Sequence, residues 1–219
     1  MRKLLILRPE PGASASAERA RALGLEVLIC PLFAVQSIAW TAPDPARFDA
    51  LLLTSANALR HAGPGLRALA VLPVVAVGEA TADAARAAGF AVSHVGDAGV
   101  DALLRTLPGR QHLLHLAGED HWTVETAHHV EHQPVYRAAM IDDPRLPDLS
   151  DLVVAVHSPR AGARLGQLAG DRSATVIAAI SDAAAAACGP GWQMVEHAKR
   201  PDDMALLALA ARLCQSRLA

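Results

Sequence analysis

The chain has 219 residues, of which 52% are hydrophobic, 19% charged and only 3% aromatic, with a formal net charge of −2. This composition is typical of a folded protein with a substantial core and excludes a disordered chain. A slightly acidic chain with few aromatic rings and no basic block longer than a pair does not favour nucleic-acid binding. An acidic ligand would therefore have to be held by local donors rather than by an overall positive field.

The N-terminal segment MRKLLILRPEPG starts with basic residues, but its apolar run ends at Arg8 and is too short for a secretion signal. No apolar stretch approaches the length needed to cross a membrane. The cysteines Cys30, Cys188 and Cys214 are widely spaced, which predicts neither a disulfide framework nor a cysteine-based zinc site. We therefore expect a cytoplasmic protein without membrane association.

Short apolar segments alternate with Ala-rich segments along the whole chain. The apolar segments are LLIL (4–7), ALLLT (50–54), VVAVG (74–78), LLHLA (113–117), LVVAV (152–156) and VIAAI (176–180). Continuous apolar strands of this kind predict an α/β fold, with parallel sheets covered by helices on both faces. Helix starts are expected at Ser55/Asn57, Thr81/Asp83, Ser158 and Ser181/Asp182, which are good capping residues. The helix that begins near Ala80 is expected to end at Gly89.

The chain contains an internal repeat. Aligning Ser55 with Ser158 gives an offset of 103 residues (158 − 55), and the same offset places VVAVGEATADAA on IAAISDAAAAAC. It also places the ALL of 102–104 on the ALL of 205–207. Residues 39–47 and 139–151, rich in Pro and Asp, are the expected linkers. The sequence therefore predicts two related lobes joined by two crossings of the chain.

Polar turns follow the predicted strands, at the edge of a parallel sheet where ligands usually bind. The turns are LRPEPG, LTSANA, VGEATA, LAGEDH, VHSPRA and ISDAAA. Backbone N–H groups and helix dipoles at such turns bind anions without requiring Lys or Arg. Each turn alone is explained by helix capping, whereas six together favour a ligand rich in carboxylates. Gly78 stands outside any GxGxxG or P-loop pattern, which disfavours a Rossmann-type nucleotide enzyme.

Residues 112–132 contain six histidines, and His128 and His132 are spaced one helical turn apart. This stretch is interpreted as a surface helix with a solvated histidine face, and zinc binding is the less favoured alternative. Tyr136, the only tyrosine, has two interpretations. It is either a strand residue chosen for β-propensity or a neutral phenol that offers a proton to a ligand.

Taken together and in order, LLILRPEPG, FDALLLTSANAL, VVAVGEATADAARAAGF, PVYRAAM, VVAVHSPRAGARL and RPDDMALLALAARL resemble the uroporphyrinogen-III synthase family. The resemblance implies two α/β lobes joined by a two-stranded β ladder. One lobe would contain residues 1–34 and 142–219, the other residues 41–133, and the ladder residues 34–40 and 135–141. The implied substrate is hydroxymethylbilane, a linear tetrapyrrole with eight carboxylates, and the family needs no cofactor and points to a monomer.

The resemblance also implies roles for particular residues. Tyr136 is the candidate proton donor. The implied substrate-binding residues are Arg8, Ser55, Asn57, Gly78, Thr81, Ser158 and Ser181. In the second repeat the pattern departs from the family: Ser181 and Ala184 replace a glycine and a threonine, and His157 replaces a threonine. Backbone donation remains possible there. The rival hypothesis is a non-catalytic two-lobed binding protein or sensor for a small polycarboxylate.

Overall fold

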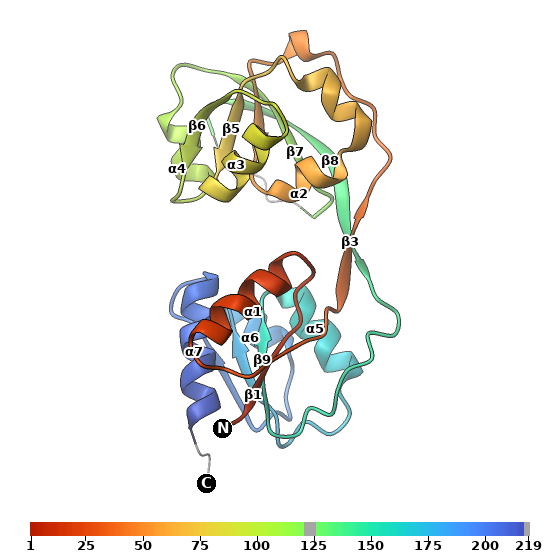
Figure 1. Cartoon of the computed structure of the whole chain (residues 1–219), viewed down its shortest axis with the longest axis vertical. Coiled ribbons are helices and arrows are strands. Elements are labelled where there is room, and N and C mark those ends of the chain that lie inside the picture. The colour runs from red at the N-terminus through yellow and green to blue at the C-terminus, as the bar shows by residue number, and fades with distance from the viewer. Residues whose placement is uncertain (121–125, 217–219) are drawn as a thin grey trace. The chain divides into compact units, whose positions relative to one another are not determined.

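The computed structural model describes residues 1–120 and 126–216 and divides into two compact units (Figure 1). Unit 1 comprises Met1–Ala34 and Ala139–Ala219, and unit 2 comprises Val35–Ala138. The chain therefore passes between the units twice, after residue 34 and after residue 138. No helix within the described ranges is long and apolar enough to span a bilayer.

Unit 1 contains a five-stranded parallel sheet with the order β11-β10-β9-β1-β2. Its strands are β1 (Lys3–Ile6), β2 (Val27–Ile29), β9 (Leu152–Val156), β10 (Val176–Ala179) and β11 (Met194–His197). Its helices are α1 (Gly12–Ala22), α5 (Pro159–Leu168), α6 (Asp182–Ala187) and α7 (Asp203–Gln215). Helices α1 and α7 lie together over Leu4, Ile6, Val153 and Ala155 (Figure 1). The alternate side chains, such as the fully buried Val154, point to the opposite face, where α5 and α6 pack.

Unit 2 contains a six-stranded sheet with the order β3-β8-β7-β4-β5-β6, in which the five strands from β8 to β6 are parallel. Its strands are β3 (Phe33–Ser37), β4 (Ala50–Leu53), β5 (Val74–Val77), β6 (Val92–Gly96), β7 (His112–Gly118) and β8 (His129–Met140). Its helices are α2 (Ala56–His61), α3 (Glu79–Ala87) and α4 (Val100–Thr106), with short 3₁₀ helices at Pro45–Arg47 and Gly63–Leu69. Helices α2 and α3 cover one face of the sheet and α4 the other.

Strands β3 and β8, which carry the chain between the units, are hydrogen-bonded neighbours. The pairing continues beyond β3, where the Ile38 amide donates to the Val135 carbonyl over 2.9 Å. At the other end, the Ile141 amide donates to the Leu32 carbonyl over 3.0 Å. The predicted fold class, two related α/β units with a two-stranded ladder, is confirmed.

The internal repeat is visible element by element. Helices α2 and α5 begin at residues 56 and 159, α3 and α6 at 79 and 182, and α4 and α7 at 100 and 203, a difference of 103 each time. The strand order β6-β5-β4-β7-β8 of unit 2 matches β11-β10-β9-β1-β2 of unit 1 position by position. One connection differs in length between the repeats: residues 7–26, which include α1, join β1 to β2, and residues 119–128 join β7 to β8.

The capping predictions are correct for three helices and wrong for one. Ser55, Ser158 and Ser181 are the N-caps of α2, α5 and α6, and each hydroxyl accepts a backbone N–H of its own helix. Thr81 was expected to cap α3, but the cap is Gly78, and Thr81 is a buried residue within the helix. A glycine cap with φ of +81° begins this helix without a side-chain oxygen, so the cap moves three residues upstream. The helix ends as expected at Gly89, where φ is +88°.

The predicted surface helix at 112–132 is wrong, because strands β7 and β8 occupy most of this stretch. The i,i+4 spacing of His128 and His132 fits a helix, but pairing of β8 with two neighbouring strands overrides that local pattern. His128 itself has a structural role. Its Nδ1 accepts the Gln111 amide over 3.1 Å, and its Nε2 lies 2.9 Å from the Leu104 carbonyl, to which it donates. His121, which belongs to the same predicted cluster, lies outside the described residues.

Candidate functional site

Most of the predicted site residues lie just beyond the carboxyl ends of parallel strands. In unit 1, Arg8 follows β1, Ser158 follows β9 and Ser181 follows β10. In unit 2 the corresponding residues are Ser55, Asn57, Gly78 and Thr81, together with Tyr136 on β8. Each unit therefore has its own polar edge, along which these residues lie.

Gly78 and Ser181 occupy the same place in the two repeats, since 181 − 78 is 103, but they begin their helices differently. Gly78 has φ of +81°, and a Cβ built there would contact nothing within 4 Å. The glycine is therefore required by the backbone conformation and not by packing. Ser181 has φ of −154° and caps its helix with its hydroxyl. Ser181, which replaces the expected glycine, therefore still allows the helix to start, because its hydroxyl caps the helix.

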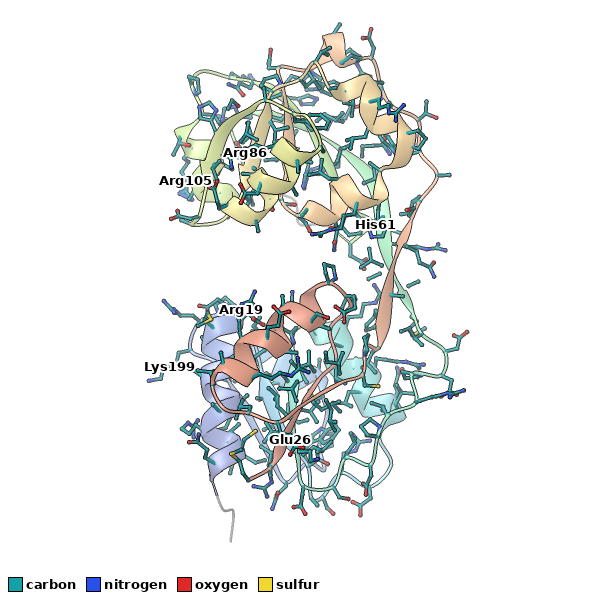
Figure 2. The ribbon with its side chains drawn as sticks, viewed as in Figure 1. Arg19, Glu26, His61, Arg86, Arg105 and Lys199 are labelled. Atoms are coloured by element: carbon teal, nitrogen blue, oxygen red, sulfur yellow. The ribbon has the colours of Figure 1, made fainter. Side chains whose placement is uncertain are left out.

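Tyr136 is the predicted proton donor, and its phenol is partly buried in unit 2. Burial raises the pKa of Tyr136, while hydrogen bonds from the Ser55 side chain and the Gly118 backbone offset this in part. His61 of α2, labelled in Figure 2, places its ring 6.1 Å from the Tyr136 ring, centroid to centroid. The phenol therefore remains protonated at neutral pH beside the Ser55 turn, as a proton donor must.

Gly118, at the end of β7, is a neighbour of Tyr136 that the sequence did not single out. A Cβ built on Gly118 would lie 2.9 Å from Cε2 and 3.0 Å from Cζ of the Tyr136 ring. The two residues are partners in the parallel ladder, next to a register shift after Ala117. The missing side chain of Gly118 is what lets the phenol ring approach strand β7 this closely.

Gly118→Ala is expected to displace the Tyr136 ring and to cost about 1–3 kcal/mol of unfolding free energy through overpacking. A displaced phenol is more hydrated, so its pKa should fall toward the ordinary value of about 10. Because Tyr136 is the only tyrosine, tyrosinate absorbance measured against pH reports this one group. Gly170→Ala is the matched control, since a Cβ there meets nothing within 4 Å. An unchanged titration in Gly118→Ala would show that this contact does not position the phenol.

His115 of β7 and His132 of β8 lie next to each other, which the sequence did not predict. Nδ1 of His115 lies 3.0 Å from Nδ1 of His132, and Nε2 of His115 lies 2.9 Å from the Thr54 hydroxyl. They line a pocket of about 210 Å³ in unit 2 that Tyr136 and Asp120 also line. The remaining lining side chains are mainly aliphatic, from β4, β5, α4 and β8. The two histidines become neighbours only through strand pairing, so their sequence spacing held no signal for it.

Unit 1 has a polar cluster around the Asp203 carboxylate at the start of α7. Its Oδ1 accepts the Ser16 hydroxyl over 2.7 Å and lies 2.9 Å from Nε2 of His157. Arg8 lies 3.3 Å from the same oxygen, and Arg19 of α1, labelled in Figure 2, pairs with Oδ2. Arg8, a predicted substrate-binding residue, is thus held by Asp203 and by the Ser16 hydroxyl at 3.1 Å.

The charges in this cluster are set by burial and by hydrogen bonds. Burial alone would raise the pKa of Asp203, but hydrogen bonds from His157, Ser16 and Arg19 outweigh it and hold that pKa far below its usual range. Burial lowers the pKa of His157, and the hydrogen bond and negative charge of Asp203 offset this only in part. At neutral pH a neutral His157 therefore donates Nε2–H to an ionised Asp203. His157 replaces the expected threonine as a structural hydrogen-bond donor.

No group of three or more His, Cys, Asp or Glu side chains within residues 1–120 and 126–216 is arranged to hold a metal ion. The polar groups of the two units include backbone amides at helix starts, hydroxyl groups, imidazoles, one phenol, and the Asp203 carboxylate with its arginine partners. Such groups bind and orient an acidic organic ligand and exchange protons with it.

These features define a class of duplicated two-unit α/β proteins. They are the repeated parallel sheets, the discontinuous first unit, the polar turns at the strand ends and the partly buried phenol. A family model described as uroporphyrinogen-III synthase HemD (HEM4) matches residues 14–208. The chain therefore belongs to the uroporphyrinogen-III synthase family.

Solved structures agree with this assignment at the level of the fold. Uroporphyrinogen-III synthetase from Helicobacter pylori is 18% identical, with a TM-score of 0.67 over 97% of this chain and 100% of that chain. A mutant uroporphyrinogen III synthase from Thermus thermophilus is 20% identical, with a TM-score of 0.54 over 98% of this chain and 100% of that chain. Among curated protein sequences, none matches this chain.

Proposed function

We propose that this chain is a cyclising lyase that converts hydroxymethylbilane into uroporphyrinogen III. Membership of the uroporphyrinogen-III synthase family supports this substrate and this reaction. The observation that carries the proposal is the partly buried Tyr136 phenol, whose pKa is raised by burial and which lies beside Ser55 and Gly118. A phenol that stays protonated at neutral pH can give its proton to a ligand.

The reaction begins when the terminal hydroxyl of the linear tetrapyrrole leaves as water, and the Tyr136 phenol supplies the proton that this departure requires. The resulting azafulvene is attacked by the substituted carbon of ring D, which gives a spiro intermediate. This intermediate fragments and recloses with ring D inverted, and a proton is lost as the pyrrole is restored. Water is the only other product, so the step balances without an oxidant or a reductant.

The protein must also control the conformation of the substrate, since ring closure without an enzyme gives the uninverted type I isomer. The helix starts at Ser55, Gly78, Ser158 and Ser181 present backbone N–H groups that suit carboxylates. Amides of this kind can bind the acidic arms of the substrate while ring D turns. We further propose that the protein acts as a monomer in the cytoplasm, in keeping with the family.

The proposal is tested by the isomer ratio of the product formed from freshly generated hydroxymethylbilane. The products are oxidised to porphyrins, and types I and III are separated by chromatography. We expect type III to predominate over a control without protein. Type I alone from folded protein would contradict the proposal and favour the rival hypothesis, a two-lobed protein that binds a polycarboxylate without converting it.

A further inference from the structure

The polar cluster around Asp203 belongs to unit 1 alone. The repeat offset of 103 residues places Val100 of unit 2 at the position of Asp203 (203 − 103). In the same way it places Thr54 at the position of His157 (157 − 103). Unit 2 therefore forms the equivalent strand order without a carboxylate or an imidazole at these places. The fold does not need the cluster, and polar groups that a fold does not need are typical of functional positions.

The cluster carries more positive than negative charge. Arg8 and Arg19 each contact a different oxygen of the Asp203 carboxylate. His157 donates to the same carboxylate as a neutral imidazole, so two guanidinium groups share one negative charge. One positive charge is therefore left over beside the carboxyl end of β1, at the edge of a parallel sheet where ligands usually bind.

No second carboxylate of the chain neutralises this charge. Glu10 and Glu18 are the acidic residues closest in sequence to the two arginines. In the part of the chain that the structure describes, neither forms an ion pair with Arg8 or Arg19. Glu10 instead accepts the backbone N–H and the hydroxyl of Ser14, over 3.0 and 2.9 Å.

Arg8 also keeps unused hydrogen-bond donors. Its bonds to Ser16 and Asp203 both come from Nη1. Since a guanidinium has five N–H donors, Nε and Nη2 of Arg8 remain without a partner among the described residues. Arg19, on α1 (Figure 2), bonds Asp203 through Nη1 alone. The side chains of Arg8 and Arg19 are 33% and 45% exposed, so a ligand can reach them.

Gly12, the first residue of α1, makes room for the Arg8 guanidinium. A Cβ built on Gly12 would lie 2.6 Å from Nε, 2.8 Å from Cζ and 2.8 Å from Nη2 of Arg8. Because Cζ is as close as Nη2, Gly12 contacts the face of the guanidinium and not its N–H edge. Gly12 has no positive φ, so the glycine is explained by this contact and not by a turn. A cation over the first turn of a helix is disfavoured by the helix dipole, which is a further cost of this arrangement.

We propose that Arg8 and Arg19, on either side of the Asp203 carboxylate, form a subsite of unit 1 for one carboxylate arm of the substrate. The assignment of the arm to the substrate rests on the proposed function. A guanidinium binds a carboxylate through two parallel, charge-assisted hydrogen bonds, which suits the unused edge of Arg8. Backbone amides at the helix starts carry no net charge, so this subsite adds a charged contact to them.

Binding is tested with propionate, a single carboxylate arm, on the whole chain labelled with ¹⁵N. The Nε–H signals of the arginines are followed by NMR at constant ionic strength as propionate is added. We expect the signals of Arg8 and Arg19 to move, with a dissociation constant on the order of 10 mM. Propionamide has the same shape without the charge and should leave both signals in place. Inorganic phosphate is the second probe, and movement with phosphate alone would contradict a carboxylate subsite.

Arg19→Gln assigns the charge to this site. The variant should weaken propionate binding about tenfold, because charge-assisted hydrogen bonds are lost. The KM for hydroxymethylbilane should rise by a similar factor while kcat stays within about twofold, since the contact holds the substrate and the transition state alike. Arg21→Gln, at an exposed position of the same helix, removes an equal charge and should change neither quantity by more than about twofold.

Gly12→Ala tests the position of Arg8 without removing a charge. The three atoms nearest to the added Cβ all belong to the end of the Arg8 side chain, which can move aside. Alanine is a better helix former than glycine, so the variant should fold. We expect propionate to bind about tenfold more weakly and the Arg8 signal to move less. Gly170→Ala is the matched control, since a Cβ there meets nothing within 4 Å.

The inference is overturned if propionate leaves both arginine signals unmoved, if propionamide moves them equally, or if Arg21→Gln weakens binding as much as Arg19→Gln. The isomer assay separates this failure from a failure of the proposed function. Type III product without propionate binding would remove the subsite and leave the function. Propionate binding with only type I product would leave a carboxylate site in a protein of another function.

Discussion

Replacing Asp203 by asparagine is expected to lower the free energy of unfolding of unit 1 by about 3 kcal/mol at neutral pH. The carboxylate has only 18% of its surface exposed and joins Arg8, Arg19, Ser16 and His157. Asparagine keeps the shape but removes the charge that two arginines require. Its side-chain NH₂ group would face partners that are themselves donors, so some of the hydrogen bonds made by the carboxylate would be lost.

The effect should depend on pH in a definite direction. The pKa of Asp203 is depressed in the fold, so the ionised carboxylate stabilises unit 1 fully above its unfolded pKa of about 3.9. That contribution is lost as the pH falls through the folded value. The difference between wild type and Asp203→Asn should therefore be full near neutrality and narrow in acid below about pH 4.

Native-state hydrogen exchange measures this change unit by unit. Amides of β9 report on unit 1, and those of β4, the equivalent strand of the repeat, provide the reference in unit 2. We expect faster exchange in β9 alone. Asp182→Asn, at a side chain that is 90% exposed, is the control and should change stability by about 0.5 kcal/mol or less. Equal exchange of β9 in wild type and Asp203→Asn would contradict the role given to this carboxylate.

The fold could be predicted from the sequence because its strands and helix caps are determined by neighbouring residues. Apolar segments such as Leu51–Leu53 and Val153–Val156 are buried strands whose burial on both faces leaves no polar alternation. The serines that follow them cap helices through their own hydroxyls, within three residues. The offset of 103 residues could be recognised because the same local pattern occurs twice in the chain.

The parts that the sequence did not reveal depend on pairing across long distances. Asp203 meets Ser16 across 187 residues, and a carboxylate in the first turn of a helix is indistinguishable from an ordinary helix-start residue. His115 and His132 meet through the register of β7 and β8, while the helical spacing of His128 and His132 suggested another structure. Tyr136 was found by residue chemistry, but its neighbour Gly118 could be recognised only once the ring was placed.

Tyr136→Phe is expected to lower the rate of type III formation by about 100-fold or more, because general acid catalysis contributes that much or more. Phenylalanine fills the same space, so the ring still packs against Gly118 while the hydroxyl that bonds Ser55 is lost. Uncatalysed closure continues and gives type I, so the variant should show a changed product ratio as well as a lower rate.

Thr81→Ala is the comparison that separates proton donation from packing in the same unit. Thr81 is buried within α3, and its loss should cost stability while lowering the rate far less than Tyr136→Phe. Both variants are assayed for the rate and ratio of the isomers at equal folded concentration. If Tyr136→Phe keeps the wild-type rate to within about twofold, proton donation by the phenol is wrong, because a general acid cannot be removed at so small a cost.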